Sequence, residues 1–417
     1  MSLPSRSVWR TGGLAAALLS LMLPACVPAA EIGAIGGAAV GPVPSGRAEG
    51  QFIRVAIAQR KPTVDLAVNG GFQIFTADSA LSVRSGPHLS SVTVRGTREG
   101  ILLGNDLLPN QAVRVEPSRD ATIHVNGQRL RGQIEIRRQQ DLTLLVINHL
   151  DIEDYLRGVI SKEAPHYWRM EALKALAIAA RTYALAQQQT KAGVDFDVTG
   201  DVMSQVYGGR EGEKGRTSRA VNDTRGIVLT YQGRLFPAFY HSTCGGRTEH
   251  GSVMGPGYDL EPLQGNAACS FCSASPFYRW QQRLSKADVA WAVKKSGRGS
   301  VWPVDGLAVV ALSRTGRVSK VEVHGSRSLT MSGADFRQLI GFDRLRSLAF
   351  TIRPEGDDFV LDGRGWGHGV GMCQWGAAEL ARRGLSASEI LAFYYPGARI
   401  TRVGELEMQP RVGEGGS

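Results

Sequence analysis

The chain has 417 residues, of which 43% are hydrophobic, 21% are charged and 51 are glycine. This composition is typical of a globular protein of two or three domains; it excludes a disordered chain, and no G-X-Y period indicates a collagen-like fibre. Basic residues exceed acidic ones by 48 − 38 = 10, which suits an acidic polymer as a partner, and nucleic acid is only one such polymer.

The first 26 residues have the pattern of an export signal. Arg6 and Arg10 precede an apolar run over 14–23, and small residues follow up to Cys26. This order predicts a signal peptide over 1–26, whose apolar run is too short to span a bilayer. The Leu-Pro-Ala-Cys sequence that ends at Cys26 is similar to a bacterial lipobox, in which Cys26 is lipidated. Plain secretion with cleavage after Ala30 is the alternative.

We therefore expect an exported protein of the periplasm or cell envelope, in contact with the membrane only through a lipid on Cys26. A second hydrophobic run of about 18 residues, the length of a spanning helix, is not present in the sequence. Residues 27–50 are rich in Ala, Gly, Pro and Ser, which predicts a flexible linker.

Residues 51–148 contain short runs in which apolar and polar residues alternate, separated by turn residues. This period of two predicts a β-rich module. The runs cover 53–57, 71–75, 112–115, 134–136 and 142–147.

Residues 149–400 mix helical and strand patterns, and 401–417 form a tail. The expected fold class is therefore α+β, a β-rich N-terminal module followed by a mixed α/β domain with a long buried helix. The expected helices cover 151–161, 169 or 170 to 188, 374–383 and 387–394. The expected strands cover 226–231, 236–240, 307–313 and 318–323.

The helix expected over 172–186 is apolar on every face, which predicts burial. Lys174 and Arg181 are seven residues apart in it and so share a face. A buried cation is costly unless it is paired. Either both side chains reach a solvated edge, or they face Glu163, which lies where the chain turns between two helices.

Glycine alternates with other residues throughout 363–371. In an extended strand the glycines would lie on one face, and Arg364, Trp366, His368 and Val370 on the other. The glycine face would allow close approach, and the Arg/Trp/His face suits a sugar ring. The segment lacks the G-x-G-x-x-G order and the βαβ unit of a dinucleotide site. A purely structural glycine-rich strand is the alternative.

Four cysteines follow Cys26, and two of them form a Cys-x-x-Cys pair. Such spacing is typical of zinc ligands, and a closed structural Zn²⁺ site would use four thiolates, or His241 or His250 in place of Cys373. Two disulfides are the alternative, because export permits them. The four residues are Cys244, Cys269, Cys272 and Cys373.

These motifs together resemble the SpoIID/LytB family of bacterial wall proteins, which includes SpoIID lytic transglycosylases and amidase enhancers. The likeness covers about 145–400 in the expected order. This chain departs from the family pattern at Ala164, where methionine is common, and at Cys244 and Cys373, where serine is common. The matching stretches are YLRGVISKEAP (155–165), EALKALAIAARTY (171–183), YHSTCGGRTE (240–249), GRGWGHGVGMCQWGA (363–377) and YYPG (394–397).

The resemblance implies a SpoIID-like catalytic domain that cleaves the MurNAc–GlcNAc bond without water. The muramyl 6-hydroxyl attacks its own anomeric carbon and leaves a 1,6-anhydro end, so that one acid/base suffices where hydrolases need two carboxylates. Glu163 is the residue expected to act, with a pKa raised by burial.

The resemblance also implies partners and contacts. Peptidoglycan glycan strands, stripped of their stem peptides, are the expected substrate; a cell-wall amidase is a second expected partner, and nucleic acid is not expected. The alternative is a non-catalytic, glycan-binding enhancer of an amidase. The residues expected to position or bind the substrate are Lys174, Arg181, Tyr240, His241, Arg364, Trp366, His368 and Gln374.

Overall fold

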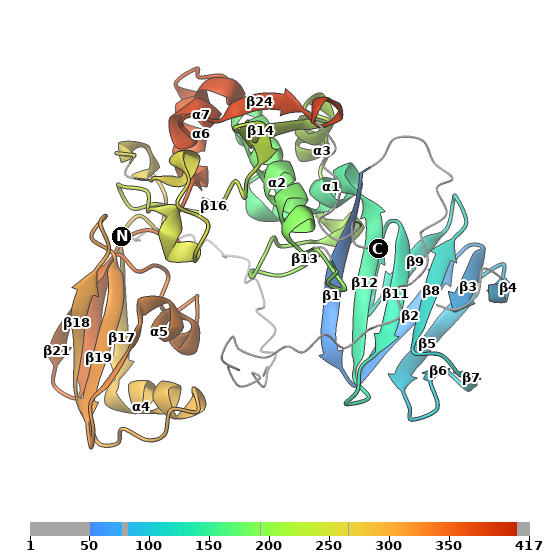
Figure 1. The fold of residues 1–417 in the computed structure, drawn as a ribbon, viewed down its shortest axis with the longest axis horizontal. Helices are drawn as coiled ribbons and strands as arrows, with labels where there is room; N and C mark the ends of the chain where they lie inside the picture. The colour runs from blue at the N-terminus through green and yellow to red at the C-terminus, as the bar shows by residue number, and fades with distance from the viewer. Residues whose placement is uncertain (1–50, 77–81, 192, 266, 407–417) are drawn as a thin grey trace, which may run out of the picture.

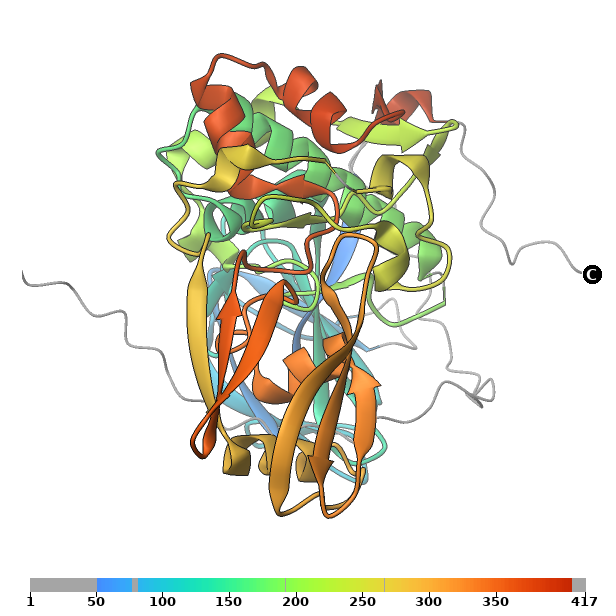
Figure 2. The same ribbon diagram turned by 90° about the vertical axis from the view of Figure 1, so that its left-hand side faces the viewer.

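A computed structural model of the protein describes residues 51–76, 82–191, 193–265 and 267–406. The predicted signal peptide, Cys26 and the linker lie outside the described residues, as does most of the predicted tail. A helical domain lies at the top of Figure 1, and a β module and a smaller lobe, here called the insert, extend from the same side of it. Figure 2 shows the insert in front of the β module, below the helices.

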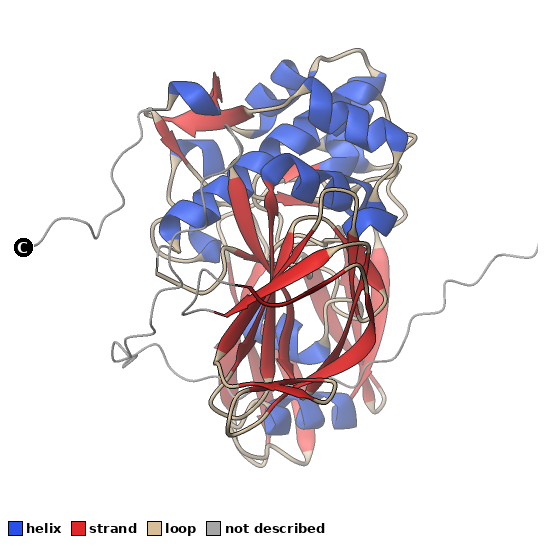
Figure 3. Cartoon of the chain, turned by 90° about the vertical axis from the view of Figure 1, so that its right-hand side faces the viewer, coloured by secondary structure: helices blue, strands red, loops and turns tan. Residues whose placement is uncertain are grey.

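The β module is a sandwich of two sheets. Apolar side chains alternate with exposed ones along its strands, as in β2, and the inward ones form the core. Figure 3 shows these strands below the helices. The first sheet has the order β13-β1-β12-β11-β8-β3-β4 and the second β10-β9-β2-β5-β6-β7. The bounds are β1 (Phe52–Lys61), β2 (Thr63–Asn69), β3 (Phe72–Thr76), β4 (Ser82–Gly86), β5 (Leu89–Gly96), β6 (Ile101–Leu103), β7 (Asp106–Leu108), β8 (Ala112–Pro117), β9 (Thr122–Val125), β10 (Gln128–Leu130), β11 (Gln133–Arg138), β12 (Leu144–Asp151) and β13 (Val198–Thr199).

The helical domain is built around α2, which is buried from Ala172 to Ala186 except at Lys174. α2 packs against α1, α3, α6, α7 and β14. β14 pairs with β15 and β24, and β16 runs parallel to β23. The bounds are α1 (Ile152–Glu163), α2 (Met170–Thr190), α3 (Gly215–Asp223), α6 (Gln374–Arg382), α7 (Ala387–Tyr394), β14 (Ile227–Tyr231), β15 (Arg234–Leu235), β16 (Tyr240–His241), β23 (Met372–Cys373) and β24 (Arg399–Arg402).

The insert has a hydrophobic core of its own, separate from the core that the β module and the helical domain share. Its sheets have the orders β17-β22-β21 and β18-β19-β20. The bounds are β17 (Trp280–Ser285), α4 (Lys286–Lys295), β18 (Val304–Leu312), β19 (Val318–Gly325), β20 (Leu329–Ser332), α5 (Gly333–Ile340), β21 (Phe350–Glu355) and β22 (Asp358–Gly363). The short 3-10 helices of the described chain are η1 (Gly209–Gly212), η2 (Gly251–Met254), η3 (Glu261–Leu263), η4 (Ser270–Cys272) and η5 (Val403–Glu405).

The α+β class is confirmed, and so are the four expected helices, each within two residues at either end. The strand expected over 236–240 is wrong except at Tyr240. Pro237 has no N–H to donate to a sheet, and Phe236, Ala238 and Phe239 are buried in irregular backbone instead. Across the described residues, we find no helix with the length and apolar character required to cross a membrane.

The extended strand expected over 363–371 is also wrong. β22 ends at Gly363, and Gly365, Gly367, Gly369 and Gly371 have φ values of 80°, 111°, 89° and 69°. Such positive values suit glycine alone, so the alternating glycines let the chain wind. The side chains between them therefore do not form one common face.

Candidate active site

Glu163 is the last residue of α1, and the helix ends there for local reasons. The side chain of Asp151 caps its first turn by accepting a hydrogen bond from the Glu153 N–H. At the other end Ala164 is extended (φ −143°), a conformation that the following Pro165 favours. The Glu163 side chain is thereby placed at the open end of the helix.

Two segments that are distant in sequence bind the Glu163 carboxylate. The Val206 N–H donates to Oε1 at 3.0 Å, and Nε2 of Gln374 donates to Oε2 at 3.2 Å. Val206 lies 43 residues and Gln374 211 residues from Glu163 along the chain. The site is thus assembled from the end of α1, the loop 200–208 and the start of α6.

Burial raises the pKa of Glu163, and the hydrogen bonds from Val206 and Gln374 offset only part of that rise. Among the described residues, Glu163 takes part in no ion pair. The shift extends the protonated form of Glu163, the form that a general acid needs, to higher pH than in an exposed glutamate.

Arg181 and Lys174 do not face Glu163. The Arg181 guanidinium is fully buried and forms a two-bond ion pair with Glu153, at 2.6 and 3.0 Å. It also donates to the carbonyls of Ile227 and Val221. This corrects the expected substrate contact, because no face of the Arg181 side chain remains for a ligand.

Lys174 lies on the half-exposed side of α2. Its ammonium is 3.2 Å from Glu171 and 3.8 Å from Asp223, so it connects α2 with α3. The sequence left open whether Lys174 reaches a solvated edge or faces Glu163, and in the structure it reaches the solvated edge. Neither possibility holds for Arg181, whose charge is paired inside the domain with Glu153.

Tyr240 lies beside Glu163. Its hydroxyl oxygen accepts a hydrogen bond from Nε2 of Gln205 at 2.9 Å. Burial raises the pKa of Tyr240 and of Tyr155, and the nearby charge of Glu163 adds to the rise. Gln205 and Val206 were not among the residues expected from the sequence, because their loop meets α1 only through a tertiary contact.

His241 is buried, and His368 is half-buried beside it, with ring centroids 5.6 Å apart. Nε2 of His368 donates to the Tyr240 carbonyl at 3.0 Å, and its Nδ1 accepts from the Val370 N–H at 3.0 Å. Burial lowers the pKa of His368 to about 4 and that of His241 well below its ordinary value. Nδ1 of His241 bonds the Val370 carbonyl at 3.1 Å, and only 4% of the residue is exposed. These rings hold β16 against the winding glycine segment, and the expected substrate contact of His241 is corrected because its ring is turned inward.

Arg364 and Trp366 lie at the junction with the insert. Trp366 packs edge-on against Phe277, with ring centroids 4.2 Å apart, and Arg346 lies over both rings. Arg364 is exposed. Within the described part of the chain no contact joins Arg364 or Trp366 to Glu163. Gln374, in contrast, is brought directly onto the Glu163 carboxylate.

The four cysteines converge in one buried cluster, with all sulfur atoms within 4.8 Å of one another. The Cys244 and Cys272 sulfur atoms are 3.4 Å apart, which is too long for a disulfide and close to the about 3.8 Å between thiolates on one tetrahedral Zn²⁺. The Cys244 and Gly376 N–H groups donate to the Cys373 sulfur. Hydrogen bonds from Cys244 hold the pKa of Cys272 and Cys269 below the ordinary value. The donor set fits a structural zinc ion.

The insert reaches this cluster through the turn between β18 and β19. Nη2 of Arg317 donates to the Cys244 carbonyl at 2.7 Å, and the guanidinium lies 3.9 Å from Glu249. Ser313 and Thr315 both donate to the same Glu249 carboxylate, at 2.5 and 2.7 Å. The insert is therefore docked next to the cysteines by buried polar contacts.

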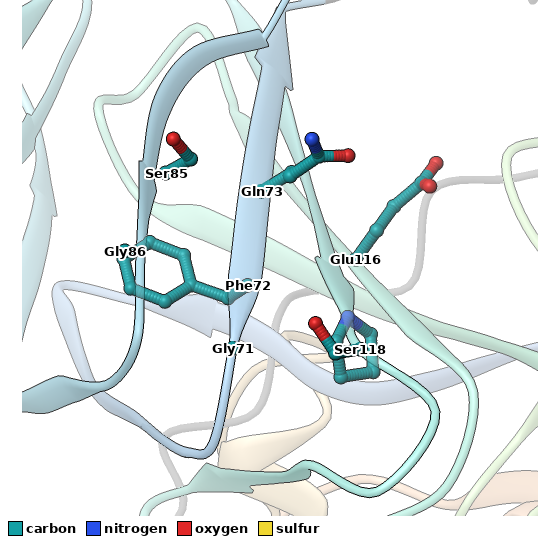
Figure 4. A pocket seen from close by; sticks show the side chains of 8 residues that line it. Gly71, Phe72, Gln73, Ser85, Gly86, Glu116 and Ser118 are labelled. Carbon is teal, nitrogen blue, oxygen red and sulfur yellow. The ribbon is translucent and has the colours of Figure 1, made fainter.

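A recess on the β module offers no comparable chemistry. It lies between β3, β4 and the end of β8. Figure 4 shows the Phe72 ring beside Gly86, and the Glu116 side chain pointing away from that ring. Glu116 is paired with Arg114 in the same sheet. Without a convergent set of reactive groups, this recess is a surface feature of the sandwich.

Comparison with known proteins gives matches over both halves of the chain. The family model described as SpoIID, Stage II sporulation protein, matches residues 140–231, which contain α1, Glu163 and α2. A second model, a domain of unknown function (DUF8618), matches residues 270–371, which contain the insert.

Three curated relatives are similar over longer stretches. An uncharacterized protein of Brachyspira hyodysenteriae is 29% identical over 87% of this chain and 96% of its own length. The amidase enhancer of Bacillus subtilis is 29% identical over 59% of this chain, and the match spans 40% of that protein. Stage II sporulation protein D of Bacillus subtilis is 28% identical over 61% of this chain and 76% of its own length.

Proposed function

We propose that the protein is a peptidoglycan lytic transglycosylase with Glu163 as its acid/base. The match of residues 140–231 to the SpoIID family model and the similarity to a stage II sporulation protein D support this proposal. The observation that carries the proposal is the Glu163 carboxyl itself. It is half-buried, its pKa is raised by that burial, and each of its oxygens accepts a hydrogen bond from a distant segment.

The reaction needs one acid/base because the nucleophile belongs to the substrate. Protonated Glu163 gives its proton to the glycosidic oxygen, so that the GlcNAc unit leaves with a hydroxyl group. The muramyl 6-hydroxyl attacks its own anomeric carbon, and Glu163 takes the proton from that oxygen as the 1,6-anhydro bond forms. Atoms balance without water, and Glu163 returns to its starting state.

Tyr240 and Gln374 have different parts in this proposal. Gln374 holds Oε2 of Glu163 and so sets the direction of the carboxyl. Tyr240, whose hydroxyl oxygen is bonded by Gln205, presents its hydroxyl beside Glu163 to the sugar. Glycan strands without stem peptides are the proposed substrate.

A structural Zn²⁺ ion held by the four cysteines is part of the proposal. Cys373 is the N-cap of α6, and Gln374 is the first residue of that helix. A metal bound to Cys373 would therefore fix the helix end from which Gln374 reaches Glu163. Four thiolates would fill a tetrahedral shell, so the ion would have a structural role and would leave no position for a substrate.

Export, anchoring and partners follow from the sequence and are proposed on that ground. The signal-like segment would direct the chain to the cell envelope, with Cys26 as a lipid anchor. The likeness to an amidase enhancer favours a second candidate, a glycan-binding protein that stimulates a cell-wall amidase without cutting glycan itself.

The deciding experiment incubates residues 27–417, unaltered and as Glu163→Gln, with glycan strands that keep or lack their stem peptides. We expect 1,6-anhydro-muramyl ends by mass spectrometry from the unaltered chain only. Hydrated reducing ends would make water the nucleophile and would require a second carboxylate. Retention of glycan by both proteins without cleavage would support the enhancer instead.

A further inference from the structure

Gln205 lies at the centre of a buried hydrogen-bond chain beside Glu163. It belongs to the loop 200–208 between β13 and η1, and only 1% of the residue is exposed. Its Oε1 accepts from the Tyr155 hydroxyl at 3.0 Å. Its Nε2 donates to the Ala180 carbonyl at 3.2 Å and to the Tyr240 hydroxyl oxygen at 2.9 Å.

The direction of every bond in this chain is fixed by one partner. A backbone carbonyl can only accept, so the amide nitrogen of Gln205 must face Ala180. The amide oxygen then faces Tyr155, whose hydroxyl has to donate. The second N–H of the amide is directed at the oxygen of Tyr240, so the hydroxyl hydrogen of Tyr240 is left to donate in another direction.

Gln205 also fixes the position of a backbone N–H group that donates a hydrogen bond to Glu163. Val206 directly follows Gln205, and its N–H lies 3.0 Å from Oε1 of Glu163. The anchoring of Gln205 to Ala180, in the middle of α2, therefore fixes the backbone that presents this N–H. One buried amide thus contacts the Tyr240 hydroxyl and anchors the loop whose Val206 N–H binds Glu163.

We propose that Gln205 is a positioning residue of the Glu163 site: it turns the Tyr240 hydroxyl into a hydrogen-bond donor toward a neutral sugar oxygen, and it keeps the Val206 N–H on Glu163. The sugar as acceptor rests on the proposed function. The hold on Glu163 does not, because it concerns contacts inside the protein.

The test uses Gln205→Met, which keeps the length of the side chain and removes its polar atoms. Gln188→Met is the matched control, because Gln188 donates to the Phe52 carbonyl and to Asp197, away from Glu163. The carboxyl of Glu163 is titrated by NMR in protein with ¹³C-labelled glutamate and is assigned by its loss in Glu163→Gln. Initial rates of anhydro-end formation give kcat and KM.

We expect the pKa of Glu163 to rise in Gln205→Met, because a carboxylate that loses an N–H donor is less stable as the anion. We expect kcat to fall by about 10- to 100-fold with a smaller change in KM, as displaced catalytic groups do. Gln188→Met should leave both quantities unchanged. In a Tyr240→Phe background the loss caused by Gln205→Met should shrink, because the two changes act through one hydroxyl.

An unchanged titration of Glu163 together with kcat within twofold would overturn the proposal. If Gln205→Met does not fold, Tyr155→Phe replaces it, because this variant removes only the hydroxyl that donates to Gln205. Tyr155→Phe should lower kcat severalfold. An unchanged kcat and an unchanged titration of Glu163 in this variant would also overturn the proposal. If the unaltered chain forms no anhydro ends, the proposed function fails, while the NMR comparison still decides whether Gln205 positions Glu163.

Discussion

Two ion pairs of the insert and one ion pair of the helical domain lie at different depths in the protein. On the insert, opposite charges meet at the surface, as in the pairs Arg283–Asp358 and Arg344–Asp288. In the helical domain, Arg181 and Glu153 are both buried and paired, while Glu163 is half-buried with no ionic partner among the described residues.

The difference indicates which charges maintain the fold and which are available for chemistry. Exposed pairs are screened by water and contribute little each. A buried pair is structural, because removal of either partner leaves an uncompensated charge. A buried carboxyl held only by neutral donors lowers stability when ionised, and such groups are concentrated at functional sites. Glu163, which is half-buried and has no ionic partner among the described residues, is an example of this third kind.

The largest expected effect is on the cysteine cluster. We expect about one zinc ion per purified chain, and loss of the helical domain on chelation or in Cys272→Ser, because structural zinc contributes about 10–16 kcal/mol in small metal-dependent folds. The insert core should persist, since it is separate. Metal analysis and hydrogen exchange, followed region by region, test this. Two disulfides with no metal would contradict it.

The second-largest effect is expected for Glu163→Gln. This variant should lose about 10²- to 10⁴-fold in the rate of anhydro-end formation, which is the range for a general acid/base. The midpoint of thermal unfolding should stay the same or rise, because the variant removes a poorly solvated charge that no cation compensates. A drop in both activity and stability would mean that Glu163 is part of the scaffold instead.

Arg181→Met should destabilise the protein by about 3–5 kcal/mol, because Glu153 is left buried without its partner. The measurement is urea unfolding followed by tryptophan fluorescence. Arg283→Met on the surface of the insert is the control and should cause no measurable change. Unchanged stability with lost glycan retention would return Arg181 to the substrate-binding residues.

The pH dependence of stability should have opposite signs in the two regions. Burial raises the pKa of Glu163 in the folded state, so its protonated form favours folding. The free energy of unfolding should therefore fall as the pH rises from the ordinary glutamate value through the folded-state pKa. Unfolding of Glu163→Gln, measured across the same pH range, should lack this fall.

Asp288 should give the smallest effect. Its hydrogen bonds with Arg344 hold the pKa of Asp288 down, to about 2, so its contribution is present above the unfolded value and is lost as the pH falls toward 2. Thermal unfolding of Arg344→Gln between pH 4 and pH 2 should show a weaker acid dependence than the unaltered chain. An equal dependence would show that other carboxylates dominate.

Much of the fold could be predicted because it is encoded locally. The apolar pattern predicts the helix ending at Thr190 and the two helices that follow Cys373, and the period of two predicts the β module. The segment 363–371 could not be predicted in this way. Its alternation is compatible with a strand, but glycine also permits positive φ at every second residue. In that wound conformation the segment bonds β16 and the insert.

For the site, the chain itself determines that Glu163 ends a helix before Pro165, and that four cysteines are available as ligands. Only the tertiary structure decides that Val206 and Gln374 meet on that carboxylate and that Glu153 neutralises Arg181. It also decides that Gln205 joins α1, α2 and β16. The physical reason is range. Periodicity and capping act over a few residues, whereas the pairing of a buried donor with an acceptor 211 residues away depends on how whole elements pack.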